Sequence, residues 1–250
     1  MTFFHKPLCL LKSLETLFFP STCKICGAFL ENVGEKVVCL ACLEKLRSRQ
    51  ARSFCIRCGR YFEGENEPHL CGRCLNTKIS FSLHRSCGRY EGNLKDMILL
   101  FKYKGYKILG KPLARFVEER LGRDKELWQG VEAIIPVPLH PKRRRARGYN
   151  QSYVLAKEIS RIKKKDVIKG LVKVKNAPPQ TLLDRDSRKK SPKGAYRVHN
   201  EEKLKGKILL LVDDVFTTGA TLTECCLILK KAGAEEVRGL TLAQASLRYS

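Results

Sequence analysis

The chain has 250 residues, and its 49 lysine and arginine side chains against 25 aspartate and glutamate side chains give a formal net charge of +24. A basic excess of this size favours a polyanionic partner: nucleic acid, anionic lipid or a heavily phosphorylated ligand. No segment approaches the roughly 20 apolar residues that cross a bilayer, and no secretory signal is recognisable, so we expect no membrane span and an intracellular protein.

The first 20 residues predict a short amphipathic helix. Apolar side chains recur at near-helical spacing from Phe3 to Phe18, and Pro20 ends the run. We therefore expect residues 1–20 to form a separate N-terminal helix.

Residues 21–76 contain one cysteine pattern written twice. Two C-x-x-C pairs separated by twelve residues recur at a constant offset of 32, through Cys23, Cys26, Cys39, Cys42, Cys55, Cys58, Cys71 and Cys74. Each copy supplies the four thiolates of a tetrahedral structural zinc site, so we predict two structural Zn²⁺ ions. The pairs can be used consecutively or interleaved. We expect consecutive pairs, because each repeat is then self-contained.

The cysteine segment is too short to bury a sufficient apolar core, so metal binding is expected to supply much of its folding free energy. Gly27 and Gly59 follow the second cysteine of each opening pair, where glycine lets the backbone turn toward the sulfurs. A redox C-x-x-C switch is the alternative interpretation. The other four cysteines are expected to be small buried apolar residues: Cys9, Cys87, Cys225 and Cys226.

Residues 77–250 predict a second domain of alternating strands and helices. A connection with a strand or two occupies 77–95, and the helical spacing of 94–121 is broken at Gly105, Gly110 and Pro112. Strands are predicted at 133–137, 170–174, 208–212 and 237–243, and helices at 150–162 and 221–232. Because several strands are apolar on both faces, we predict an α/β fold with a parallel sheet flanked by helices.

One motif in this domain points to a phosphorylated sugar. The apolar strand 208–212 leads directly into Asp213 and Asp214. Adjacent carboxylates at the carboxyl end of a parallel strand can grip the two hydroxyls of a ribose. The turn that follows presents backbone N–H groups and hydroxyls at a helix N-terminus, which forms a phosphate cradle, through Thr217, Thr218, Gly219, Ala220 and Thr221.

Two other interpretations of this motif remain. The acids can simply cap the next helix. Alternatively, the strand can belong to an ATPase whose phosphate loop runs from Gly105 to Lys111. Pro112 then stands where that loop needs a serine or threonine for magnesium.

Two basic segments are candidates for contacts to pyrophosphate or DNA. The first is a turn after strand 133–137, and its candidates are Lys142, Arg143, Arg144, Arg145 and Arg147. The second is a polar, turn-rich segment with Arg185 and Arg188, which can close over a phosphate as a mobile loop. The alternatives are a nucleic-acid-binding basic run for the first and a solvated charged loop for the second.

The motif from Leu210 to Leu222 resembles the phosphoribosyl-pyrophosphate (PRPP) loop of type I phosphoribosyltransferases. That resemblance implies that Asp213 and Asp214 contact the ribose hydroxyls and that the 217–221 turn holds the 5-phosphate. It also implies that Mg²⁺ accompanies PRPP.

From about Phe19 to Ala243 the chain resembles the ComF family of competence-associated, phosphoribosyltransferase-like proteins. The likeness rests on the cysteine ribbon and five later motifs, which lie at 90–105, 136–138, 147–151, 180–196 and 210–222. It implies a bacterial cytoplasmic protein with an N-terminal zinc ribbon, a role in natural transformation, and competence-machinery proteins as partners.

Two functional hypotheses follow. The first is an enzyme that transfers the phosphoribosyl group to an unidentified nitrogen nucleophile and releases pyrophosphate. The second is a binding module that senses PRPP or a nucleotide, or binds single-stranded DNA through its positive charge. The acceptor base and the oligomeric state are not encoded in any recognisable motif.

Overall fold

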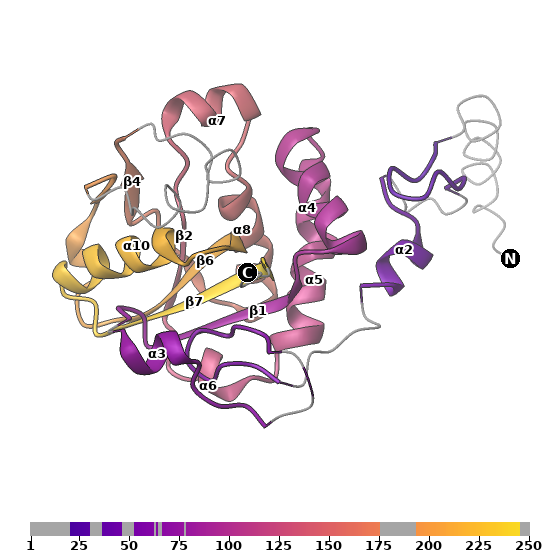
Figure 1. The fold of residues 1–250 in the computed structure, drawn as a ribbon. Coiled ribbons are helices and arrows are strands. Elements are labelled where there is room, and N and C mark those ends of the chain that lie inside the picture. Colours follow the sequence, from indigo (N-terminus) through magenta and orange to yellow (C-terminus); the bar gives the residue numbers. More distant parts are fainter. Residues whose placement is uncertain are drawn as a thin grey trace, which may run out of the picture. The chain divides into compact units, whose positions relative to one another are not determined.

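The structure is a computed structural model of the full chain, and it describes residues 21–30, 37–46, 53–62, 64, 67–77, 79–175 and 194–245. The chain divides into two compact units, residues 1–49 and residues 50–250 (Figure 1). None of the helices in these described ranges is long and apolar enough to cross a membrane. The predicted 1–20 helix, Arg185 and Arg188 lie outside the described residues.

The second unit is built on a parallel five-stranded sheet with the strand order β1-β7-β6-β2-β3. Its strands are β1 (Leu83–Arg89), β2 (Ala133–Pro136), β3 (Asp166–Val167), β6 (Ile208–Phe216) and β7 (Glu236–Gln244). The central strand β6 is almost wholly apolar up to Val212, as expected for a strand covered on both faces. The predicted parallel α/β sheet is confirmed.

Helices cover both faces of this sheet (Figure 1). Helix α10 (Ala220–Lys231) packs on one face, where Cys225 and Leu229 join Leu209 and Leu211 of β6 in a buried core. Helices α5 (Gly110–Leu121) and α8 (Gln151–Lys163) pack together against β1, β2 and β6. The described helices between β1 and β6 also include α4 (Gly92–Tyr103), η1 (Lys107–Leu109), α6 (Lys125–Trp128), α7 (Pro141–Arg147) and η3 (Glu201–Lys203).

Three element predictions need correction. Pro112 does not break the helical region, because it lies in the first turn of α5, where no intrahelical N–H donor is needed. The basic turn after β2 is the helix α7. The strand 208–212 continues to Phe216, because β7 pairs with it beyond the two acids, through Asp213–Thr241 and Phe216–Gln244.

A short antiparallel hairpin stands apart from the main sheet. It pairs β4 (Leu171–Lys173) with β5 (Tyr196–Val198). The strand at 170–174 is therefore confirmed as a strand but does not belong to the parallel sheet. Glu224 of α10 anchors the hairpin, because its carboxylate accepts hydrogen bonds from the backbone N–H groups of Gly194 and Ala195.

The second cysteine cluster is part of the second unit. Its four cysteines are buried in the same core as Phe81, Leu222 and Cys226. The predictions that Cys87, Cys225 and Cys226 are buried are confirmed, while Cys9 lies outside the described residues.

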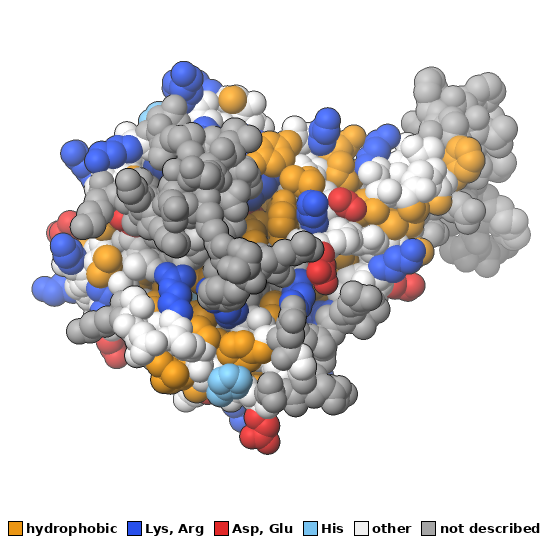
Figure 2. Space-filling model, in the orientation of Figure 1, with side chains coloured by type: hydrophobic (Ala, Val, Ile, Leu, Met, Phe, Trp, Pro, Cys, Tyr) orange, Lys and Arg blue, Asp and Glu red, His pale blue; other side chains and the backbone are white. Residues whose placement is uncertain are grey.

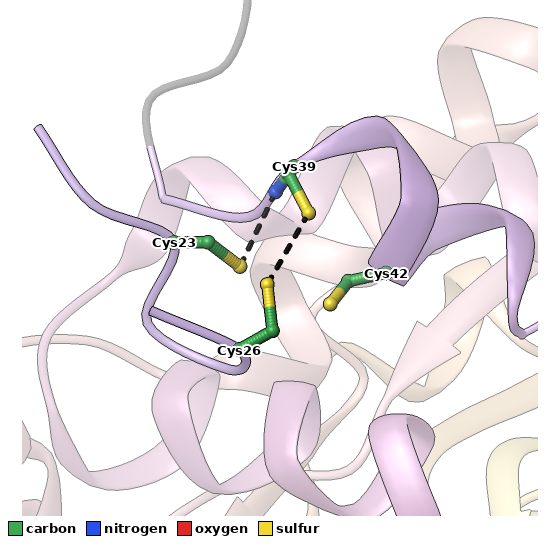
Figure 3. A group of neighbouring side chains, drawn as sticks. All are labelled: Cys23, Cys26, Cys39 and Cys42. Carbon is green, nitrogen blue, oxygen red and sulfur yellow. Dashed lines mark hydrogen bonds between the residues drawn. The ribbon is translucent and has the colours of Figure 1, made fainter. Parts of the chain in front are cut away.

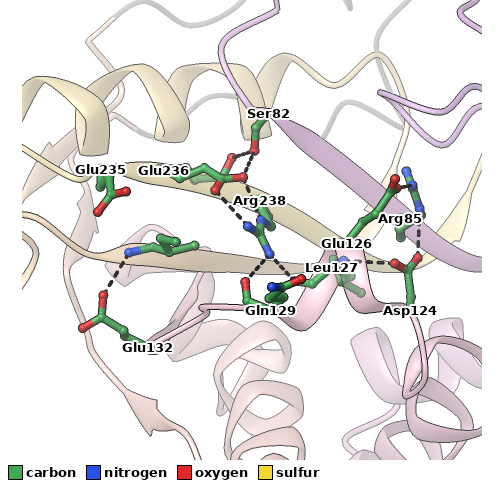
Figure 4. Close-up of polar contacts among 12 residues, drawn as sticks. Ser82, Arg85, Asp124, Glu126, Leu127, Gln129, Glu132, Glu235, Glu236 and Arg238 are labelled. Carbon is green, nitrogen blue, oxygen red and sulfur yellow. Dashed lines mark hydrogen bonds and ion pairs between the residues drawn. The ribbon is translucent and has the colours of Figure 1, made fainter.

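Two arginines join elements of this unit near the amino-terminal end of β7, where α6 lies (Figure 4). Arg85 of β1 is buried and bridges Asp124 and Glu126 to the carbonyl oxygen of Ile56 in the cysteine module. Arg238 of β7 pairs with Glu236 and donates to the carbonyl oxygen of Gln129. These contacts hold α6 and the residue after it to β1 and β7.

Candidate functional site

The first cysteine cluster brings four sulfurs together from two backbone turns (Figure 3). Its ligands are Cys23, Cys26, Cys39 and Cys42, and their sulfurs all lie within 4.8 Å of one another. The sulfurs of Cys26 and Cys39 are 3.6 Å apart, and the backbone N–H of Cys39 faces the sulfur of Cys23 at 3.4 Å. Gly27 has φ +78°, as the predicted turn requires.

The second cluster repeats this geometry with Cys55, Cys58, Cys71 and Cys74. Its closest sulfur pairs are 3.6 Å and 3.7 Å apart, and the N–H of Cys71 faces the sulfur of Cys55 at 3.4 Å. The short helices α2 (Leu40–Glu44) and α3 (Gly72–Asn76) carry the last cysteine of each cluster. Consecutive pairing of the C-x-x-C motifs is therefore confirmed.

Both clusters fit zinc. Four ligands at a Zn–S distance of about 2.3 Å in a tetrahedron place their sulfurs about 3.8 Å apart, close to the observed spacings. Hydrogen bonds from the Cys58 side chain and from backbone N–H groups lower the pKa of Cys55 to about 4, while the same side-chain contact raises the pKa of Cys58.

The predicted phosphate loop joins β6 to α10 at the carboxyl edge of the sheet. Gly219 is the residue before α10 and has φ +77°. A Cβ atom at that position would lie 2.6 Å from the ring of Phe216, so only glycine fits. Thr217, Thr218 and Thr221 are half-buried, while Ala220 begins the helix. The loop thus leads into a helix N-terminus, which attracts anions.

The two acids of β6 occupy different environments. Asp213 is half-buried and accepts a hydrogen bond from the Ser152 hydroxyl at 2.8 Å. Asp214 is 4% exposed, and its carboxylate contacts the Gln151 amide at 2.6 Å and the Lys102 ammonium at 2.6 Å. Burial and the neighbouring Asp214 carboxylate raise the pKa of Asp213 to about 7.

A polar network ties Asp214 to the basic helix α7. Gln151, the first residue of α8, donates to Asp214 and accepts a hydrogen bond from Arg147. The Arg147 guanidinium also lies over the ring of Tyr103, 5.0 Å from its centroid. Asn150 caps α8 and donates to the carbonyl oxygen of Val137, which fixes the helix start at the end of β2. The loops after β2 and β6 therefore share one hydrogen-bonded frame.

The hairpin adds a lysine beside the acids. Lys173 of β4 lies over the Tyr196 ring, 5.0 Å from its centroid. Burial and the neighbouring Arg143 lower the pKa of Lys173, and Asp213 partly offsets this effect. Three elements, β6, α7 and the hairpin, thus place charged groups at one edge of the sheet.

The basic candidates on α7 fall into two groups that differ in burial. Arg143 and Arg147 are half-buried and lie near the acids' network, whereas Lys142, Arg144 and Arg145 are exposed. Arg144 instead lines a neighbouring groove of about 770 Å³ between α7, α8, the end of β2 and the hairpin. Among the described residues, six cationic side chains line this groove and Glu158 is its single acid; the six are Lys107, Arg144, Lys157, Arg161, Lys169 and Lys173.

Lysine and arginine side chains are also spread widely over the described surface that Figure 2 shows, and acidic ones are sparse there.

Lys102, Gln151, Ser152 and Lys173 were not predicted as site residues. Lys102 and Gln151 lie inside the motifs 90–105 and 147–151 that resemble the ComF family, so that resemblance could have identified them as site residues. Lys173 lies in none of these motifs, and only the folding of the hairpin brings it near Asp213.

Comparison with protein families matches both parts of the chain. Residues 149–248 match the phosphoribosyl transferase domain, and residues 14–75 match the double zinc ribbon domain. The first match contains β6, the phosphate loop and α10, and the second contains all eight clustered cysteines.

Curated relatives include Competence protein F of Haemophilus influenzae, which is 31% identical over 91% of this chain and 99% of its own length. Competence protein ComFC of Streptococcus pneumoniae is 30% identical over 64% of this chain and 68% of its own. DNA utilization protein YhgH of Escherichia coli is 30% identical over 60% of this chain and 66% of its own. With a relative matched from end to end, a cysteine ribbon and a phosphoribosyltransferase-type sheet, the chain belongs to the ComF family.

Proposed function

We propose that the carboxyl edge of the sheet binds PRPP or a related ribose phosphate together with Mg²⁺. The observation that carries this proposal is the acid pair on β6 followed, within a few residues, by the glycine-bearing turn at the start of α10. Asp213 contacts the ribose hydroxyls. Asp214 contacts them too, through the carboxylate oxygen that pairs with Lys102 in this structure. The turn from Thr217 to Thr221 receives the 5-phosphate.

Pyrophosphate is assigned to the cations around the acids. Arg143, Arg147 and Lys173 surround this edge, and cation–phosphate pairs of this kind are charge-assisted. Arg185 and Arg188 are proposed to add to them when ligand binds. Mg²⁺ arrives with the ligand and neutralises part of its charge.

Calorimetric titration of PRPP with Mg²⁺ tests this proposal. Asp213→Asn combined with Asp214→Asn removes both carboxylates, so we expect PRPP binding to be lost while the zinc content stays at two ions per chain. Asp166→Asn, an exposed acid on β3, is the matched control and leaves binding unchanged. Binding that persists in the double variant contradicts the ribose assignment.

Whether the site also catalyses transfer is decided by a second measurement on the same protein. Release of pyrophosphate from PRPP, followed with and without single-stranded DNA, separates a phosphoribosyltransferase from a binding module. Binding without release supports the binding module.

A second function, binding of single-stranded DNA, is favoured by the groove beside the acids. Its six cations converge on a cavity of about 770 Å³, and Tyr149 and Tyr153 contribute aromatic rings to the lining. Positive grooves with aromatic rings bind single strands through phosphates and base stacking. The relatives' names refer to competence and DNA utilization, which supports a role in DNA uptake. A cytoplasmic location and competence proteins as partners are part of the same proposal.

The salt dependence of binding tests the groove. Single-strand binding weakens with salt by about 0.7 logarithmic units per phosphate contact and per decade of salt. Arg144→Ala, Lys157→Ala and Lys169→Ala together should therefore reduce the slope by about 2. The control is Arg123→Ala with Lys125→Ala, which removes exposed cations at the opposite edge of the sheet. Equal slopes for the two variants place DNA elsewhere.

A further inference from the structure

The second cysteine cluster touches the phosphate loop through one side chain. Arg73 lies in α3 between the metal ligands Cys71 and Cys74, and its guanidinium donates a hydrogen bond to the carbonyl oxygen of Thr218. The two residues are 145 positions apart in the sequence, so only the fold brings them together. Arg73 is half-buried, which shields this hydrogen bond from part of the solvent.

The bonded carbonyl sets the direction of the neighbouring amide. The carbonyl of Thr218 and the N–H of Gly219 belong to one peptide plane, and the described chain contains no cis peptide bond. In a trans peptide these two groups point in opposite directions. By holding the carbonyl on its own side, Arg73 turns the Gly219 N–H toward the other side of the loop. That amide immediately precedes the N-terminal amides of α10.

A second contact from the same cluster supports the start of the loop. The Nδ1 atom of His84 faces the carbonyl oxygen of Cys58 at 2.8 Å, and a carbonyl can only accept, so Nδ1 is the donor. The His84 ring is stacked on Phe216 with centroids 4.2 Å apart. Phe216 in turn packs against Gly219. The cluster therefore reaches the loop in two ways, directly through Arg73 and indirectly through His84 and Phe216.

The first cluster has the same ligands and spacing but belongs to the other compact unit. The second cluster contacts the phosphate loop through Arg73 within one compact unit. A ligand variant in the first cluster therefore serves as the comparison for a ligand variant in the second.

We propose that Arg73 is a positioning residue for the phosphate loop, and that metal at the second cluster, but not at the first, sets the loop's affinity for a phosphorylated ligand. This inference rests on the proposed function, namely that the loop receives the 5-phosphate of PRPP. Metal acts here by fixing α3, so that the guanidinium stays on the Thr218 carbonyl.

Arg73→Met tests the inference without altering any metal ligand. Loss of a charge-assisted hydrogen bond should raise the PRPP dissociation constant about tenfold and speed hydrogen exchange of the 217–221 amides by a similar factor. The control is Arg57→Met. Arg57 holds the equivalent place between Cys55 and Cys58, but its guanidinium donates to the carbonyl oxygen of Ile79 instead of the loop. Arg57→Met should leave both readouts within twofold of the parent protein.

The metal arm compares one ligand from each cluster in the full chain. Cys42→Ser and Cys74→Ser each remove the last cysteine of a cluster, so each should lower the zinc content from two ions to one. Only Cys74→Ser should weaken PRPP binding and speed exchange in the loop. Thermal melting of both variants shows whether either one unfolds the second unit. If Cys74→Ser does so, the PRPP affinity and loop exchange of Arg73→Met test the coupling instead.

The outcomes separate the two proposals. If the parent chain does not bind PRPP, the proposed function fails, yet loop exchange in the ligand-free protein still measures the coupling. If PRPP binds but Arg73→Met changes neither its dissociation constant nor loop exchange, the coupling is wrong. Equal effects of Cys42→Ser and Cys74→Ser on an otherwise folded chain contradict the asymmetry of the two clusters.

Discussion

Asp213 and Asp214 are adjacent in sequence but have different partners. Asp214 is compensated by Lys102 and Gln151, whereas Asp213 is half-buried and accepts a hydrogen bond from the Ser152 hydroxyl. Burial and the neighbouring Asp214 raise the pKa of Asp213 to about 7. The unfolded chain ionises this acid near its usual pKa of about 4. Between these values the folded state holds the extra proton, so the group's contribution to stability falls as the pH rises.

Asp213→Asn removes this pH-dependent contribution. We expect the variant to gain stability relative to the parent protein as the pH rises from 5 to 8, by about 2 kcal/mol, because the amide carries no buried charge. Urea unfolding at both pH values gives this difference. Asp166→Asn, which alters an exposed acid, should show no such trend. A constant difference between Asp213→Asn and the parent protein would refute the assignment.

At the scale of elements, the sequence predicted the sheet better than it predicted the surroundings of the site. Strands β2 and β6 overlap the apolar runs 133–137 and 208–212, and β7 is rich in apolar residues, which local pattern detects. Helix α7 has no apolar periodicity. The sequence marks this helix only at its ends, by Pro141 at the first helical position and by Gly148 just after the last turn, where φ is +83°.

Contacts between segments that are far apart in the sequence could not be predicted from local residue patterns. The hairpin joins β4 and β5 across the undescribed residues 176–193, and Lys102 meets Asp214 across 112 positions. The acids and the phosphate loop were identifiable because their residues are contiguous. The groups that surround them come from α4, α8 and the hairpin, so only the fold shows them.

The ion pair between α4 and β6 makes a prediction at this scale. Lys102→Met leaves the buried Asp214 carboxylate without its cation, so we expect a loss of about 3 kcal/mol in the free energy of unfolding. Adding Asp214→Asn should restore most of it, because no uncompensated charge then remains. Lys95→Met, an exposed residue of the same helix, serves as control. Chemical denaturation of the parent protein, Lys102→Met, Asp214→Asn, the double variant and the control provides the comparison, and additive losses in the double variant would exclude coupling.

At the scale of the whole molecule, two equivalent cysteine clusters have unequal support. The second is embedded in the core of the sheet unit, with all four cysteines buried. In the first, Cys26 is exposed, and the surrounding unit ends at residue 49. Metal therefore carries a larger share of folding in the first unit.

Chelation should consequently remove zinc in two steps. We expect the first ion to leave faster, with new protease cleavage between residues 21 and 49, and the second to leave with cleavage near residues 53–77. Native mass spectrometry after timed exposure to a chelator counts the ions, and peptide mapping locates the cuts. Release of both ions at one rate would show that burial of the second cluster gives it no protection.

The boundary at residue 49 has a consequence for how this architecture can vary. Every described residue assigned to sugar, phosphate or DNA lies beyond it, and so do Arg73 and His84. The second cysteine cluster is tied to the ligand-binding edge from between its own ligands, because Arg73 donates to the carbonyl oxygen of Thr218. We therefore expect backbone changes around Cys71 and Cys74 to shift the phosphate loop, which limits how far this segment can vary among related chains.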